Sequence, residues 1–201
     1  DFAPTAVERA TALAAELEIP ATFIQSDILD LVGKLPTAAF DLVYSSYGVL
    51  CWIGNLHLWM QVAATHLKPG GRLIVIDGHP LASAIADKPF APKVKGPHVV
   101  LDWPYLPQPA ALPTPAAGSY AGECTTTVNE TFEWSHSLGE IVTACAAAGL
   151  TITQLDEHAE GFFAFHPSMS KGEDRLYRFK PPLHGRYPLC FTLVATKPTS
   201  Q

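Results

Sequence analysis

The sequence is poor in charge, and the charge that it has is acidic overall. Charged residues make up only 16% of the 201 residues, and the formal net charge is −6 at pH 7. A protein that binds a nucleic-acid backbone needs a basic surface, so this balance argues against a nucleic-acid partner. The chain also lacks an apolar run of the roughly 18–20 residues that a membrane-spanning helix requires, and it has no signal-peptide pattern. We therefore expect neither a nucleic acid nor a membrane as partner.

The sequence also lacks closely spaced cysteines. Its four cysteines include no C-x-x-C pair, and three of them lie in apolar or strand-like segments. Such cysteines are typical of reduced thiols in a protein core, which indicates a cytoplasmic location. The eight histidines form no H-E-x-x-H motif and no tight cluster, so we expect no metal site.

What the sequence does contain is an alternation of helical and strand patterns, with 48% hydrophobic residues, as expected for one domain over residues 1–201. Pro4 opens a helical pattern, Asn55 caps a second, and the S-x-x-E capping box at Ser137 opens a third. The expected strands are 21–27, 40–46, 72–77, 150–158 and 189–197. Apolar strands separated by helices predict an α/β fold, with a mostly parallel sheet and helices on both faces.

Two segments interrupt this alternation. Residues 80–115 hold nine of the eighteen prolines, and residues 161–188 are rich in aromatic side chains. Proline cannot donate to a sheet ladder and ends helices, so the first segment is expected to leave the sheet. A long irregular segment within a compact domain is usually functional when it is ordered. We therefore expect cap or insert segments over 80–120 and 159–188.

Five stretches carry a family resemblance. They are FIQSDILDL (23–31), FDLVYSSYGVLCWIGNL (40–56), LKPGGRLIVID (67–77), GLTITQLDEH (149–158) and PLCFTLVATKP (188–198). In this order they resemble strands three to seven of the class I S-adenosylmethionine-dependent methyltransferases. The resemblance implies a Rossmann-like, doubly wound and mostly parallel sheet whose last strand is antiparallel.

The opening residues DFAPTA (1–6) look like the tip of that family's second strand. In the family, a first strand and a glycine-rich turn stand before this tip, and neither pattern occurs in the 201 residues. The resemblance therefore implies an N-terminally truncated sheet with an incomplete cofactor site. An apolar groove is expected beside the strand 40–46, where the first strand would pair.

The resemblance implies S-adenosylmethionine as the cofactor and places its contacts at the ends of strands. The expected contacts are Asp1, Phe2, Asp27, Ile28, Ser45 and Tyr47. The Asp1 carboxylate is expected to hold the ribose hydroxyls, with Phe2 against the adenine ring. Asp27 and the backbone N–H of Ile28 are expected at the adenine edge, and Ser45 and Tyr47 near the methionine end.

The expected acceptor is a small, partly apolar molecule bound under a cap made by 80–115 and 161–188. The candidate acceptor residues are mostly aromatic: Trp52, His79, Trp103, Tyr105, Trp134, Phe162 and Phe163. Methyl transfer is a displacement at a sulfonium, in which a protein mainly positions the reactants and excludes water. His79, directly after the strand 72–77, and Tyr47 are the candidate catalytic residues, with His79 as the base if the acceptor carries a proton.

Two other functions remain open from the sequence. A nicotinamide-dependent oxidoreductase is also built on a doubly wound sheet, and its fingerprint would precede Asp1. A non-catalytic binding module derived from the methyltransferase fold is the second alternative. Binding of S-adenosylhomocysteine or of NAD would separate these alternatives from the methyltransferase.

Overall fold

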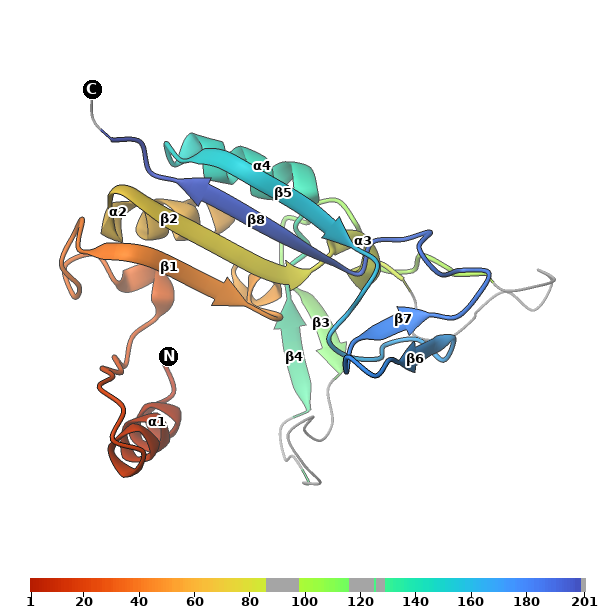
Figure 1. Ribbon diagram of the computed structural model, residues 1–201, viewed down its shortest axis with the longest axis horizontal. Helices are drawn as coiled ribbons and strands as arrows, with labels where there is room; N and C mark the ends of the chain where they lie inside the picture. Colours follow the sequence, from red (N-terminus) through yellow and green to blue (C-terminus); the bar gives the residue numbers. More distant parts are fainter. Residues whose placement is uncertain (86–97, 116–124, 126–128, 200–201) are drawn as a thin grey trace.

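A four-stranded sheet forms the centre of the molecule (Figure 1). The computed structural model describes residues 1–85, 98–115, 125 and 129–199. The strand order is β1 (Phe40–Ser46), β2 (Leu67–Gly78), β8 (Cys190–Thr196) and β5 (Thr151–His158). β1 and β2 are parallel, whereas β8 is antiparallel to both β2 and β5. The expected interior position of 72–77 and the antiparallel last strand are thus confirmed.

The sequence pattern of β2 explains its central place. Leu73 and Val75 are fully buried, and Val75 lies in register between Ser45 of β1 and Leu193 of β8. β-branched and other apolar residues suit a strand that has neighbours on both sides. β2 also begins earlier than expected, because the KPGG stretch is already paired through Gly70 N–H to Lys197 O and Lys197 N–H to Gly71 O.

Helices α2 (Leu56–His66) and α4 (Leu138–Ala147) pack on the same face of the sheet. Both have the caps that the sequence predicts: Asn55 Oδ1 accepts from Leu58 N, and Ser137 Oγ accepts from Glu140 N. The core between helices and sheet contains Trp59, Met60, Leu73, Val75, Ile141, Cys145, Phe191 and Leu193. Burial of these apolar side chains is the main favourable term in the stability of the sheet.

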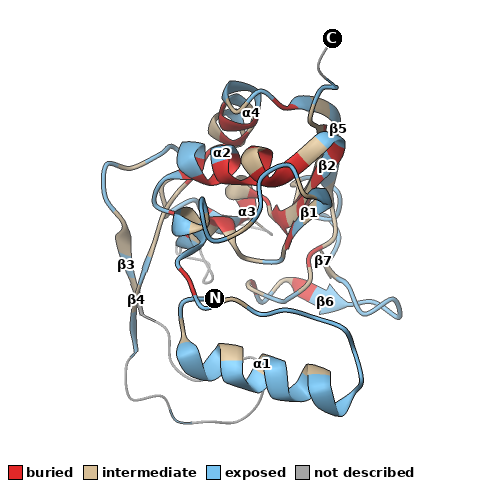
Figure 2. Ribbon diagram, turned by 90° about the vertical axis from the view of Figure 1, so that its left-hand side faces the viewer, coloured by how far each residue is buried: buried red, intermediate tan, exposed pale blue. Residues whose placement is uncertain are grey.

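The second face of the sheet differs from the expectation. Ile74 of β2 and Val194 of β8 point away from the main core and are only half-buried. Helix α1 (Pro4–Glu16) has the expected Pro at its start, yet it contains no buried residue (Figure 2). Among the described residues, the helices that pack against the sheet therefore share one face. Apolar residues at helical spacing favour a helix in α1, but this spacing alone does not bring the helix against the sheet.

Residues 21–27 do not form the expected strand. They have no regular structure, and Phe23 is exposed. Asp1 N–H donates to Ile24 O at 3.2 Å and Ser26 N–H donates to Asp1 O at 2.9 Å, which is the hydrogen-bond pattern of a parallel ladder one residue long. The segment has strand character only where it meets Asp1, because a strand needs a neighbour along its whole length to satisfy its backbone groups.

An apolar groove runs beside β1, as expected. Its volume is about 380 Å³, and its walls include Leu42, Tyr44, Val62 and Ala63. Leu42 and Tyr44 keep about half of their surface exposed, at 49% and 55%. In the described part of the chain, β1 pairs only with β2, so the other edge of β1 has no strand beside it.

Small elements from the two inserts and from the segment between them lie beyond the carboxyl end of β2. These are α3 (Pro80–Ser83), the antiparallel pair β3 (Leu112–Pro115) and β4 (Glu130–Glu133), and the antiparallel pair β6 (Met169–Lys171) and β7 (Tyr177–Phe179). A second apolar cluster joins α3 to the later insert through Ala82, Ile85, Met169, Phe179 and Leu183. The two inserts thus meet in this cluster; residues 86–97 and 116–120 of the first expected insert lie outside the described residues.

A change at Gly71 is expected to destabilise the sheet. A Cβ at this position would lie 2.9 Å from Lys68 O and 3.0 Å from Phe40 O, and backbone atoms cannot move aside easily. Gly71→Ala should therefore lower the free energy of unfolding by about 1–3 kcal/mol, measured by urea denaturation. Gly78→Ala on the same strand is the control, because a Cβ there meets nothing within 4 Å. Equal effects of the two substitutions would contradict the steric explanation.

Candidate active site

A wide cleft lies between the N-terminal segments and the loop after β1. Its volume is about 860 Å³, and it is lined by Asp1, Phe2, Asp27 and Ile28 together with the loop residues Gly48 and Trp52. Four of the expected cofactor contacts thus come together in one cleft, although they are separated by more than twenty positions in the sequence. Trp52, expected at the acceptor, lines this cleft instead.

The two carboxylates of the cleft have local hydrogen bonds. Asp1 Oδ1 accepts from Ala3 N at 2.8 Å, and Asp27 Oδ1 accepts from Leu29 N at 2.8 Å. Asp27 thereby caps a short 3-10 helix, η1 (Ile28–Asp30). The first N–H groups of a helix have no partner within it, so the N–H of Ile28 is oriented as a donor at the helix start. These carboxylates and this donor match the polar groups of a ribose and an adenine edge.

Ser45 and Tyr47 lie differently from the expectation. Ser45 lines the apolar groove beside β1 and not the cleft, and its buried hydroxyl has no hydrogen-bond partner. Tyr47 has a φ of 59° and an exposed side chain, and its ring packs on Phe162 with centroids 4.6 Å apart. The neighbouring Gly48 is the residue of this loop that borders the cleft.

Asp77, which sequence reasoning did not single out, organises the loop after β1. It lies near the end of β2 and is 4% exposed. Its carboxylate accepts the N–H groups of Gly48 at 2.6 Å, Val49 at 3.0 Å, Leu50 at 3.0 Å and Gly78 at 2.7 Å. A buried carboxylate with this many donors is well compensated for its loss of water. The only signal in the sequence is an acid at the end of an otherwise apolar strand.

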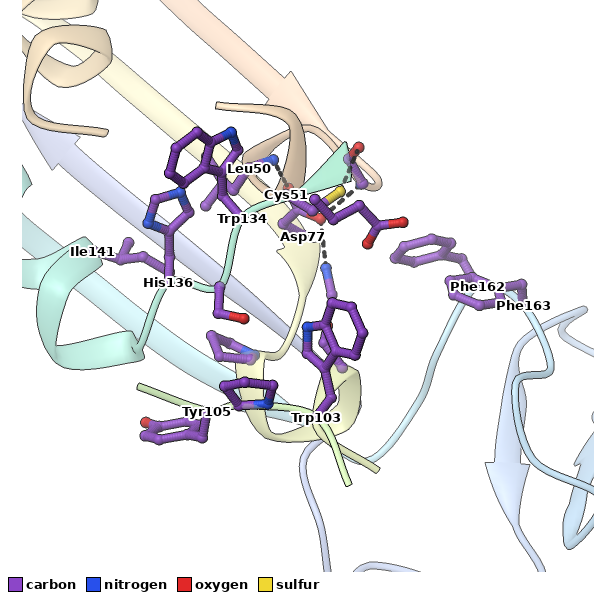
Figure 3. A pocket seen from close by; sticks show the side chains of 17 residues that line it. Leu50, Cys51, Asp77, Trp103, Tyr105, Trp134, His136, Ile141, Phe162 and Phe163 are labelled. Atoms are coloured by element: carbon purple, nitrogen blue, oxygen red, sulfur yellow. Dashed lines mark hydrogen bonds between the residues drawn. The ribbon is translucent and has the colours of Figure 1, made fainter. Parts of the chain in front are cut away.

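A second, smaller hollow also borders this loop, and Figure 3 shows the side chains that line it. Its volume is about 180 Å³. Five of the expected acceptor residues line it: Trp103, Tyr105, Trp134, Phe162 and Phe163. Trp103 and Tyr105 come from the first insert, Trp134 follows β4, and Phe162 and Phe163 begin the second insert. The loop residue Gly48 borders both this pocket and the wide cleft, so the two hollows share a wall.

Trp134 connects the aromatic pocket to the loop that separates the two hollows. Its backbone N–H donates to Cys51 O at 2.8 Å. Its indole ring lies against Gly54, where a Cβ would come within 2.9 Å of the ring. The close approach of this ring requires glycine at position 54, which fixes the indole against the loop.

His79 does not reach the described hollows. It is 3% exposed and caps α3, with Nδ1 accepting from Leu81 N at 3.0 Å. Its Nε2 lies 2.8 Å from Glu157 Oε1, and burial lowers the pKa of His79 despite the opposing effect of Glu157. The ring therefore has a structural position between α3 and β5, and the expectation that it serves as base or acceptor contact is corrected.

Two further residues of the aromatic pocket, His136 and Cys51, have side chains capable of acid–base or nucleophilic chemistry. His136 lines the aromatic pocket, but Nδ1 lies 3.0 Å from Glu140 Oε2 and Nε2 lies 2.7 Å from Ile53 O, so both nitrogens are engaged. Burial raises the pKa of the Cys51 thiol to about 12, with Glu133 and Asp77 adding to the effect. A thiol in that state is a poor nucleophile at neutral pH.

Glu133 is the second site residue that sequence reasoning missed. It ends β4, is half-buried and lines both the aromatic pocket and an adjoining hollow of about 210 Å³. Burial raises its pKa, and a hydrogen bond with the Thr114 side chain offsets part of this effect. β4 is only four residues long, so its alternation of polar and apolar residues is a weak signal. The sequence therefore does not reveal that the Glu133 side chain lines a pocket.

Comparisons with known proteins agree with this arrangement. Residues 1–75 match the model of a methyltransferase domain family. An S-adenosylmethionine-dependent methyltransferase from Mesorhizobium loti is 17% identical, with a TM-score of 0.62 over 98% of this chain and 77% of the other. One from Clostridium acetobutylicum is 12% identical, with a TM-score of 0.59 over 98% and 73%. No curated protein matches the sequence.

A third structure adds a bound product of the cofactor. Geranyl diphosphate C-methyltransferase from Streptomyces coelicolor A3(2), in complex with S-adenosyl-L-homocysteine, is 13% identical, with a TM-score of 0.52 over 98% of this chain and 62% of the other. The chain therefore has the Rossmann-like α/β fold of the class I S-adenosylmethionine-dependent methyltransferases. The resemblance in the sequence is confirmed at the level of the fold.

Two further findings concern the described residues alone. Their helices include none that is long and apolar enough to cross a membrane. The same part of the chain contains no group of three or more His, Cys, Asp or Glu side chains arranged to hold a metal ion.

Removal of the Asp77 charge is expected to loosen the loop between the hollows. Asn offers one acceptor oxygen in place of two, and its amide group would face backbone donors. Asp77→Asn should lower the free energy of unfolding by about 1–3 kcal/mol. Amide hydrogen exchange at Gly48 and Leu50 should become faster.

The control for this substitution is Asp156→Asn on the exposed strand β5. A surface change of this kind should alter stability by less than about 0.5 kcal/mol. Unchanged exchange at Gly48 and Leu50 in Asp77→Asn would show that the loop does not depend on the carboxylate.

Proposed function

We propose that the protein catalyses methyl transfer from S-adenosylmethionine to a small molecule. The observation that carries the proposal is the pair of hollows on either side of the loop after β1. The wide cleft has carboxylates suited to a nucleoside, and the smaller pocket has an aromatic lining suited to a partly apolar acceptor. The methyltransferase fold and the S-adenosylmethionine dependence of the similar structures support the choice of S-adenosylmethionine.

The residues of the cleft fit the cofactor in their chemistry. Asp1 is proposed to accept hydrogen bonds from the ribose hydroxyls, with Phe2 against the base. Asp27 and the N–H of Ile28 are proposed to bind the adenine edge. The shared wall at Gly48 would then lie near the methionine end. Tyr47, which packs on Phe162, is proposed to link this loop to the pocket and not to act as a base.

In methyl transfer the protein mainly has to position the methyl donor and the acceptor. S-adenosylmethionine supplies an electrophilic methyl group when it is bound. The loop held by Asp77 is proposed to keep the two ligands in line across their shared wall, which converts an encounter of two molecules into a step within one complex. The aromatic rings of the insert segments are proposed to exclude water from the acceptor.

The proposal is tested by calorimetric titration of the full-length protein with S-adenosylhomocysteine and, separately, with NAD. Binding of S-adenosylhomocysteine without binding of NAD is expected, because the cleft is assigned to an adenosine with a methionine side chain. Binding of NAD alone would favour the oxidoreductase alternative. Binding of neither ligand would favour a non-catalytic module and would contradict the proposal.

Asp27 provides a sharper test of the cleft. Asp27→Ala should weaken S-adenosylhomocysteine binding by about 1–3 kcal/mol, because polar contacts to the adenine edge are lost. Asp30→Ala is the matched control, since Asp30 lies on the same 3-10 helix but outside the lining of the cleft. An affinity unchanged by Asp27→Ala, or lowered equally by both substitutions, would remove Asp27 from the site.

A further inference from the structure

The described lining of the aromatic pocket contains carboxylates but neither Lys nor Arg. Among the described residues that line it, the acids are Asp77 and Glu133, and none is Lys or Arg. An acceptor that carries a carboxylate or phosphate would find no countercharge on these walls and would be repelled by the acids. The lining therefore favours a neutral or positively charged acceptor.

The two acids differ in their capacity to bind a ligand. Asp77 is already surrounded by the four backbone N–H groups of Gly48, Val49, Leu50 and Gly78. Glu133 has no such set of donors, and the ion pairs of the described residues do not include it. Glu133 is half-buried, and the described residues give it no ion-pair partner, so its carboxylate bears a cost of desolvation that a bound cation would relieve.

The rings that line the same pocket as Glu133 have the same preference for positive charge. Trp103 and Tyr105 of the first insert, Trp134 after β4 and Phe162 of the second insert line this one hollow (Figure 3). The face of an aromatic ring attracts a cation, and the attraction is strongest for Trp. Aromatic faces combined with a carboxylate that has no ion-pair partner among the described residues are a suitable environment for an organic ammonium group.

We propose that the methyl acceptor is an organic amine, bound as its ammonium form between these rings and the Glu133 carboxylate. The inference rests on the proposed function, because it names the substrate class of the same site. It also gives Glu133 a catalytic role, since an ammonium nitrogen has no lone pair with which to attack a methyl group.

The proton and electron pairs balance in the step. The ammonium N–H proton passes to a Glu133 oxygen and leaves the amine neutral. The nitrogen lone pair then forms the N–CH₃ bond while the S–CH₃ bond breaks, and its electron pair stays on sulfur as a neutral thioether. The positive charge moves from sulfur to the methylated nitrogen. Burial raises the pKa of Glu133, which makes the carboxylate a better base for this transfer.

The test measures binding of matched probes to the protein saturated with S-adenosylhomocysteine. The probes are phenethylamine and n-butylamine, each compared with the alcohol of the same carbon skeleton, 2-phenylethanol and 1-butanol. Quenching of tryptophan fluorescence and calorimetry report binding. At least one amine should bind about tenfold or more tightly than its alcohol, the size of effect expected for a charge pair in a partly desolvated site.

Substitution of Glu133 separates the charge from the rings. Glu133→Gln should remove the preference for the amine while leaving S-adenosylhomocysteine affinity unchanged. Glu130→Gln is the matched control, because Glu130 lies on the same strand and is exposed. Unchanged S-adenosylhomocysteine affinity also shows that the Glu133 variant is folded.

The outcomes distinguish the inference from the function on which it rests. If S-adenosylhomocysteine binds but neither amine is preferred over its alcohol, or if Glu133→Gln keeps the preference, the amine inference is overturned and the proposed function stands. If S-adenosylhomocysteine does not bind to the wild-type protein, the proposed function itself fails. An amine preference that Glu130→Gln also abolishes would assign the effect to the general field of the strand and overturn the role of Glu133.

Discussion

The site depends on one buried carboxylate. Asp77 accepts the N–H groups of Gly48, Val49 and Leu50, and thereby ties the loop after β1 to the end of β2. Tyr47 and Gly48 are in left-handed backbone conformations, with φ values of 59° and 87°. A non-glycine residue bears a steric cost there, which the surrounding contacts must offset. The carboxylate supplies those contacts at the point where the loop becomes the wall between two hollows.

The position of Asp77 ties the loop between the two hollows to an interior strand of the sheet. β2 lies inside the sheet, paired on both sides, and its apolar residues are in the main core. A loop that is hydrogen-bonded to this strand is expected to open less readily, because the strand belongs to the most buried part of the molecule. The aromatic pocket, in contrast, takes its rings from segments outside the four-stranded sheet. Under the proposed function, a loop tied to the sheet places the methyl donor, and these outer segments select the acceptor.

Much of the fold could be predicted from the sequence, because its signals are local. The apolar run of 72–77, the cap at Asn55 and the capping box at Ser137 each specify an element without reference to distant residues. The predicted strand 21–27 does not form, because apolar residues in this segment form a strand only where another strand lies beside them. The prediction of helices on both faces of the sheet was wrong for the same reason. Helix α1 has apolar residues at helical spacing, but this spacing does not specify the surface against which they pack.

The site was predicted less completely, and the misses have a common cause. Aromatic residues in inserts at the carboxyl edge of a sheet are expected to face a ligand, and four of them line one pocket together with Trp134. The roles of Asp77 and Glu133 depend on contacts made over long sequence distances: Asp77 meets a loop 27–29 positions away. His79 attracted the prediction by its place after a strand, but the start of α3 uses its ring as a cap.

Asp77 and Glu133 differ in how far their carboxylates are compensated by hydrogen-bond donors, and this difference gives them different roles in the pocket. A carboxylate that is saturated by backbone donors fixes geometry and has little left with which to attract a ligand. A carboxylate that is partly desolvated and unpaired does the opposite, since a charged ligand can relieve what the fold leaves uncompensated. Asp77 and Glu133 line the same pocket and divide these tasks. Trp134 holds them in a fixed relation, because it follows Glu133 in the chain, is bonded to Cys51 O and packs on Gly54 of the loop that Asp77 organises.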